Sequence, residues 1–156
     1  MARVSFEVVH RFDAPAETVW DALIDWSFHA EWVPMTRIEM GPGDSATVGA
    51  TFTAWTGPGP LALKDRMRVT KLDWDSNTSS GTCEVDKLGP VLKGRAGFTV
   101  IPAGTGSELH WTEDVSVRLV PKLLAPVVGR LGAAGFRHGL RRLAQLLPGR
   151  PPFSAG

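Results

Sequence analysis

The chain has 156 residues, a length typical of one domain that buries about two-thirds of the surface of its unfolded chain. Its single cysteine, Cys83, excludes an intrachain disulfide, and the lack of a signal-peptide-like apolar run near the start leads us to expect a cytoplasmic protein. The net charge of +1 is unevenly placed, since residues 1–114 carry 10 Lys/Arg and all 16 Asp/Glu, whereas residues 115–156 carry 7 Lys/Arg and no acid.

The first part of the chain predicts a strand followed by two short helices. Residues 4–12 alternate apolar and polar side chains, which is the pattern of a half-buried strand. Pro15 favours a helix start, and this helix is expected to run to about Asp25. A second short helix is expected over residues 27–32, closed by Pro34.

Six further strands are expected between turns rich in glycine, proline, asparagine and aspartate. They cover residues 37–40, 48–56, 63–74, 80–88, 92–101 and 108–119. Pro121 begins the last helical region, and Pro126 is expected to bend or delay it. No internal repeat or linker interrupts the chain, so we expect one domain over residues 1–147 and a flexible tail over residues 148–156.

The last helix combines an apolar sector with glycines. On a helical wheel one sector contains Leu124, Val128, Leu131, Phe136, Leu140, Leu143, Leu146 and Leu147. Gly132, Gly135 and Gly139 fall in the same sector, although each glycine costs a helix about 0.5–1 kcal/mol relative to alanine. The helix is therefore expected either to cover a cavity or to be approached closely by another backbone.

The order of elements predicts an α+β fold. An antiparallel meander of this length curls, and one long helix can cover its concave face. We therefore expect a curled antiparallel sheet of about seven strands around the C-terminal helix, with two short helices after the first strand.

Several stretches also resemble a known group of proteins. Residues 12–25, which read FDAPAETVWDALID, and the following Trp32-Val33-Pro34 resemble the opening signature of the START-like (SRPBCC) superfamily. Within that superfamily the chain is most similar to the bacterial polyketide cyclase/dehydrase proteins. Val48-Gly49, Val69-Thr70 and residues 109–113, which read LHWTE, extend the resemblance, which covers about residues 4–147.

The resemblance implies the helix-grip fold, with a deep apolar cavity between the sheet and the C-terminal helix. Members bind lipids, polyketides, hormones or quinones there, and a minority catalyse cyclisation or aromatisation. We therefore expect this protein to bind a hydrophobic small molecule, such as a lipid, a polyketide or a related aromatic or isoprenoid compound, without a cofactor or metal. The expected ligand-binding residues are Trp32, Phe52, Trp55, Met67, Val69, Val85, Phe98, Trp111, Glu113, Val128, Leu131, Gly135, Phe136 and His138.

Glu113 is the one candidate catalytic residue, because it shares a strand face with Trp111 and other apolar side chains. A carboxylate in such a row must be paired, hydrated or neutralised. It would serve either as a ligand anchor or as a general acid/base in a polyketide cyclase/aromatase-type lyase. Alternatively, it forms a salt bridge at the end of the barrel, or the register of the strand is shifted. The chain has no tyrosine and no helical histidine pair for a metal, so we expect binding without catalysis.

Arg130, Arg137 and Arg141 form a basic face on the last helix, opposite its apolar sector. Such a face is typical of a solvated surface, but it also marks contact with an anionic membrane or an acidic protein partner. The arginines are not interleaved with aromatic residues, so nucleic-acid binding gains no support. Transient contact with an anionic membrane or a protein partner is therefore an alternative function.

Overall fold

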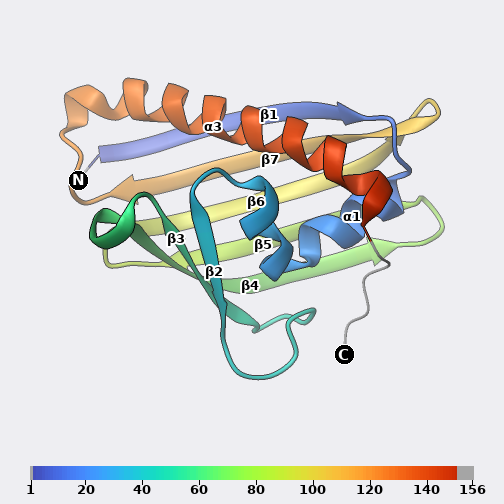
Figure 1. The fold of residues 1–156 in the computed structure, drawn as a ribbon, viewed down its shortest axis with the longest axis horizontal. Helices are drawn as coiled ribbons and strands as arrows, with labels where there is room; N and C mark the ends of the chain where they lie inside the picture. Colours follow the sequence, from blue (N-terminus) through green and yellow to red (C-terminus); the bar gives the residue numbers. More distant parts are fainter. Residues whose placement is uncertain (1, 151–156) are drawn as a thin grey trace.

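A curled antiparallel sheet carries one long helix across its inner face, as Figure 1 shows for residues 2–150 of a computed structural model. The strands lie in the order β1-β7-β6-β5-β4-β3-β2. They are β1 (Ala2–Phe12), β2 (Thr36–Met40), β3 (Thr51–Thr56), β4 (Leu63–Asp75), β5 (Ser80–Leu88), β6 (Leu92–Ala103) and β7 (Gly106–Val117). The helices are α1 (Ala16–Ile24), α2 (His29–Trp32) and α3 (Ala125–Leu146), with 3-10 turns η1 (Trp26–Phe28), η2 (Gly59–Leu61), η3 (Lys122–Leu124) and η4 (Leu147–Gly149).

The predicted helix-grip fold is confirmed, and the main boundary error lies before β3. The strand expected over residues 48–56 begins only at Thr51, because Gly49 adopts a φ of +96° and a turn occupies the preceding residues. At the other end of the chain, Arg150 pairs with Asp25 at 2.8 Å. The rest of the predicted tail, residues 151–156, lies outside the described residues.

Two tryptophans fill one half of the sheet's inner face. Trp20 from α1 and Trp26 from η1 pack against Phe98, with ring centroids 5.6 and 6.5 Å away. Trp26 also stacks on Phe52 at 4.5 Å. Aromatic rings of this size bury more area than any aliphatic side chain, so this half of the interior is solid.

A β-bulge keeps the core-facing residues of β4 on the inner face of the sheet along the whole strand. The register of β4 against β5 shifts between Val69 and Lys71. Before the shift, Asp65 and Met67 are buried on the inner face, and after it Leu72 packs against the same core. Without the extra residue the second half of the strand would present its polar side chains inward.

Small residues let α3 approach β1 closely. A Cβ atom added at Gly132 would lie 2.9 Å from Cε1 of Phe6, and one added at Gly129 would lie 3.5 Å from Cγ1 of Val4. A Cβ at Gly139 would lie 3.0 Å from the carbonyl oxygen of Trp32. Close backbone approach therefore explains Gly139, which is one of the two alternatives that the sequence left open, whereas Gly132 makes room for the ring of Phe6. No helix within residues 2–150 has both the length and the apolar character needed to cross a membrane.

The packing of Trp20 yields a test of the solid half of the core. An added Cβ at Gly81 on β5 would lie 2.6 Å from Cζ3 of Trp20, whose ring is held between Trp74 and Phe98. We expect Gly81→Ala to lower the free energy of unfolding by about 1–3 kcal/mol, measured by urea denaturation. Gly149→Ala, where a Cβ meets nothing within 4 Å, is the control and should change it by less than about 0.5 kcal/mol. Equal stability of the two variants would contradict this account of the core.

Candidate ligand-binding cavity

The other half of the inner face encloses a cavity of about 800 Å³ beneath α3. It is lined by His29, Val33, Pro34, Met35, Thr36, Ile38, Phe52, Ala54, Thr56, Asp65, Met67, Lys87, Trp111, Glu113, Leu131, Gly132, Gly135 and Phe136. Met35 and Leu131 are also 66% and 68% exposed to solvent, so they mark its mouth. The volume lies in the range of pockets that hold small molecules in other proteins.

Gly135 differs from the two other glycines of the helix sector. A Cβ atom added there would have no neighbouring atom within 4 Å, and the residue lines the cavity. Since no backbone or side chain needs the space, the missing side chain enlarges the cavity. The cavity explanation for the glycines thus applies to Gly135.

The structure brings half of the predicted ligand-binding residues to the cavity. These are Phe52, Met67, Trp111, Glu113, Leu131, Gly135 and Phe136. The aromatic members form one wall, in which the rings of Trp111 and Phe136 lie 4.6 Å apart.

The other predicted residues lie elsewhere, and two physical reasons account for them. Val69, Val85, Phe98 and Trp32 point inward as expected, but they are buried in the aromatic core. Alternation along β3 turns Phe52 and Ala54 inward, so Trp55 points to the opposite face.

Two predicted residues of α3 also lie away from the cavity. Val128 packs beneath the start of the helix in a separate cluster with Val4, Val115 and Val117. His138 is exposed to solvent, because the part of the helix that faces the sheet is narrower than the predicted apolar sector. Val128 and His138 therefore lie outside the candidate cavity.

Three charged side chains from different strands meet in the cavity wall, and we call them the acid–lysine cluster: Asp65 of β4, Lys87 of β5 and Glu113 of β7. All three residues are buried, with at most 9% of their surface exposed. The ammonium of Lys87 donates to Oδ2 of Asp65 and lies 3.5 Å from Oε2 of Glu113. Nε1 of Trp111 donates to Oε1 of Glu113 at 3.3 Å.

Small residues of β6 allow this contact across a strand. Gly94 lies opposite Lys87 and Ala96 lies opposite Glu113 in the sheet registers. With no large side chain on β6 between them, the lysine reaches over β6 to the glutamate on β7. Glu113 therefore lines the cavity and is also salt-bridged, so both roles considered for it from the sequence find a counterpart in the geometry.

Burial and ion pairing shift the pKa values of Glu113 and Lys87 in opposite directions. Burial raises the pKa of Glu113, and the nearby Asp65 raises it further, whereas Lys87 lowers it; the net pKa is above the usual value. Burial alone would lower the pKa of Lys87, but Glu113 and Asp65 more than offset this and hold its pKa above the usual value. Lys87 is therefore a cation at neutral pH, with two carboxyl groups around it.

His29 and two threonines complete the polar groups of the cavity. Nε2 of His29 lies 2.7 Å from the carbonyl oxygen of Leu23, which can only accept, so Nε2 carries the hydrogen. Burial lowers the pKa of His29 to about 4, so the ring is neutral at physiological pH. Thr36 donates to the carbonyl oxygen of Pro34 at 3.0 Å, and its hydroxyl lies 2.8 Å from that of Thr56.

Sequence reasoning missed Asp65, Lys87 and His29, although a signal for two of them was present. Lys87 continues the inner row that begins with Cys83 and Val85 at a spacing of two residues, and Asp65 precedes Met67 in the same way. A strict period of two along each strand would have placed both charges inward. His29 carries no comparable signal, because it lies in a helix of one turn.

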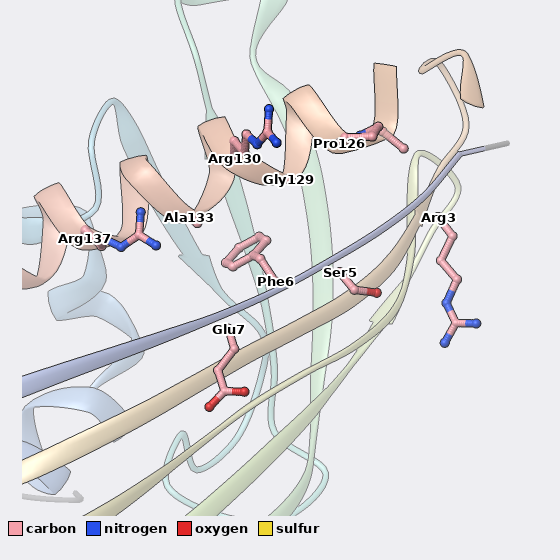
Figure 2. A pocket seen from close by; sticks show the side chains of 10 residues that line it. Arg3, Ser5, Phe6, Glu7, Pro126, Gly129, Arg130, Ala133 and Arg137 are labelled. Carbon is pink, nitrogen blue, oxygen red and sulfur yellow. The ribbon is translucent and has the colours of Figure 1, made fainter. Parts of the chain in front are cut away.

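A second, smaller hollow of about 390 Å³ lies between β1 and the first half of α3 (Figure 2). Figure 2 shows the ring of Phe6 reaching under the helix, while Arg3 and Glu7 point away from it. Arg3 is committed to Asp114 through hydrogen bonds of 2.8 and 2.6 Å. Because this groove is more polar than the larger cavity and carries both charge signs, we place the candidate ligand site in the larger, more apolar cavity.

The sequence matches the family described as polyketide cyclase/dehydrase and lipid transport over residues 3–148. The chain belongs to this family. The membership agrees with the START-like signature of residues 12–25. A search of curated proteins finds no match to this chain.

Two solved structures share the fold of this polyketide cyclase/dehydrase family protein. The crystal structure of Ara h 8.0201 superposes with a TM-score of 0.65 at 13% identity, covering 96% of this chain and all of that one. Protein CV1439 of Chromobacterium violaceum superposes with a TM-score of 0.61 at 18% identity, covering 92% of this chain and 96% of that one. At these identities the similarity concerns the fold alone.

The burial of His29 predicts that the stability of this protein depends on pH. Its pKa is about 4 in the folded protein and near 6.5 in the unfolded chain, so the unfolded chain binds more protons between these values. Stability is therefore lost as the pH falls from about 6.5 to 4, by about 3 kcal/mol in all. We expect urea denaturation near pH 7 and near pH 4.5 to show a smaller acid-induced loss in His29→Gln than in the original protein. Other acids titrate in both proteins, so an equal loss would refute the assignment to His29.

Proposed function

We propose that this protein binds a hydrophobic small molecule, such as a lipid, a polyketide or a related aromatic or isoprenoid compound, in the cavity beneath α3. The observation that carries the proposal is a cavity of about 800 Å³ whose helical wall is left open at Gly135. Phe52, Met67 and Phe136 offer apolar and aromatic surface to such a ligand. The description of the family, which includes lipid transport, points the same way.

Binding without catalysis is the form of this function that we favour. A cyclase of this family would need a group in the cavity that is free to donate or accept a proton, and Glu113 is the candidate. Its two oxygens face Nζ of Lys87 and Nε1 of Trp111, so the carboxyl group is held by the protein. Full turnover of a polyketide substrate by the intact protein and its loss in Glu113→Gln would instead establish the lyase alternative.

Filling the cavity from the helix tests the proposal directly. Gly135→Leu places a branched side chain in open space, so the variant should fold and should bind the neutral fluorescent probe N-phenyl-1-naphthylamine about tenfold or more weakly. Ala134→Leu adds the same side chain on the exposed face of α3, and its dissociation constant should match that of the original protein. If folded Gly135→Leu binds the probe as tightly as Ala134→Leu, the ligand site is not this cavity.

A second candidate function, docking on an anionic membrane surface, is favoured by exposed apolar residues beside the cavity mouth. Leu123 and Val127 are 92% and 49% exposed, and Val127 shares a helix face with Leu131 at the mouth. From residue 115 to the end the chain carries seven Lys/Arg, among them Arg130, Arg137 and Arg141, and no acid. Exposed leucines among basic residues fit the boundary of an anionic bilayer, where a ligand would enter or leave.

Vesicle co-sedimentation tests this docking. We expect binding to phosphatidylcholine vesicles that contain phosphatidylserine, weaker binding to phosphatidylcholine alone, and a decrease as salt is raised. The double variant Leu123→Ser/Val127→Ser should lose most of this binding without a change in charge. Val48, which is 61% exposed in the connection between β2 and β3, provides the matched control Val48→Ser. Equal binding to both vesicle types would exclude the basic residues of α3 as the membrane contact. Equal binding by Leu123→Ser/Val127→Ser and Val48→Ser would exclude Leu123 and Val127.

A further inference from the structure

The hydrogen-bonding groups of the cavity are unevenly divided between donors and acceptors. The acid–lysine cluster contains one ammonium and two carboxyl groups, all buried in the cavity wall. An ammonium has three hydrogens to donate, whereas two carboxylates can accept about eight hydrogen bonds. The cluster alone therefore has more hydrogen-bond acceptor positions than donor hydrogens.

The donors of the cluster are already committed within the protein. Lys87 points its ammonium at Asp65, at Glu113 and at the sulfur of Met67, which lies 3.7 Å away. The indole hydrogen of Trp111 goes to Glu113. Oδ1 of Asp65 is buried and has no hydrogen-bond partner. A buried carboxylate oxygen without a donor is costly, so the cluster contains an acceptor that the protein itself does not satisfy.

The remaining polar side chains of the cavity also present acceptors. The hydrogen of His29 is used on Leu23, which leaves Nδ1 as an acceptor. Thr36 spends its single hydroxyl hydrogen on Pro34, so in the 2.8 Å contact between hydroxyls it is Thr56 that donates. Among the described residues that line the cavity, every side-chain polar hydrogen except those of a protonated carboxyl thus has a partner in the protein.

The charge of the cavity leads to the same conclusion. With both carboxyl groups ionised the acid–lysine cluster carries a net negative charge, and with a proton on Glu113 it is neutral. In neither state is a positive charge left for an anionic ligand. A ligand carboxylate or phosphate would be desolvated beside two carboxyl groups, which is unfavourable in a buried site.

We infer that the cavity takes an apolar molecule whose polar group is a hydrogen-bond donor without negative charge, namely a hydroxyl or an amine, and that it discriminates against carboxylates. This inference rests on the proposed function and names the ligand class for the same site. Asp65 and Glu113 receive the donor, while Phe52 and Phe136 contact the apolar body. A free fatty acid is accordingly a poor ligand, and the corresponding alcohol or amine is a good one.

Four anthracenes that differ only in one substituent test the inference. They are 9-methylanthracene, 9-anthracenemethanol, 9-(aminomethyl)anthracene and 9-anthracenecarboxylate, and their dissociation constants can be measured by fluorescence near pH 7.5. We expect the alcohol and the amine to bind at least about tenfold more tightly than the carboxylate. An amine that binds more tightly than the alcohol identifies a cationic ligand, and the reverse order identifies a hydroxylated one.

Variants connect the preference to the cluster. Asp65→Asn keeps the shape of the side chain but removes one negative charge, so the ratio of carboxylate to alcohol dissociation constants should fall at least about fivefold. Asp86→Asn makes the same charge change on the outer face of β5 and should leave the ratio unchanged. Glu113→Gln serves as the second cluster variant, so that the test does not depend on the folding of one protein.

The outcomes separate this inference from the proposed function. If 9-methylanthracene binds but the carboxylate binds as tightly as the alcohol, the cavity holds apolar ligands and the donor preference is wrong. The donor preference is also wrong if the ratio is unchanged in both Asp65→Asn and Glu113→Gln. If none of the four compounds binds, including 9-methylanthracene with its apolar substituent, the proposed function itself fails, and the ligand class fails with it.

Discussion

The unequal filling of the sheet's inner face is the constraint on which the rest of this structure depends. Protein interiors are close-packed, and a void removes contacts from every side chain around it. On one half of the sheet Trp20 and Trp26 supply the volume that the strands need. On the other half α3 presents Gly135, which supplies none. The same fold is therefore filled by tryptophans at one end and hollow at the other.

The acid–lysine cluster is the second departure from an ordinary core. Replacing a buried ion pair by apolar residues of similar size is often neutral or stabilising by about 1–4 kcal/mol, so stability alone gives little reason to keep one. Here three strands each contribute a charged residue, and β6 contributes Gly94 and Ala96 so that the residues can meet. An arrangement that draws on four strands is specific, and it lies in the wall of the cavity rather than in the solid half.

Most of the fold, and about half of the residues predicted for the site, could be placed correctly from the sequence. Strand alternation, proline and glycine turns and the glycine-bearing last helix are enough for the element order, because these signals are local. The environment of Phe98 is not local: its inward direction follows from alternation, but whether it meets a ligand or a tryptophan depends on where α1 and η1 pack. Lys87 is missed because a charged side chain usually indicates the solvent face, although its spacing from Val85 indicates the inner one. Burial of a charge depends on partners from distant strands, which one strand's pattern does not reveal.

The two departures occur at the same place, and this limits what can occupy the cavity. Water would satisfy the carboxylates of the cluster, but it would leave the surfaces of Phe52, Met67 and Phe136 wet, at a cost of about 25 cal/mol per Å² of apolar area. A purely apolar molecule would cover those surfaces and leave the acceptors of Asp65 and Glu113 without donors. A molecule with an apolar body and a polar hydrogen satisfies both walls at once. Sites where local rules are broken without a structural gain are commonly functional sites, and here two broken rules point to one class of ligand.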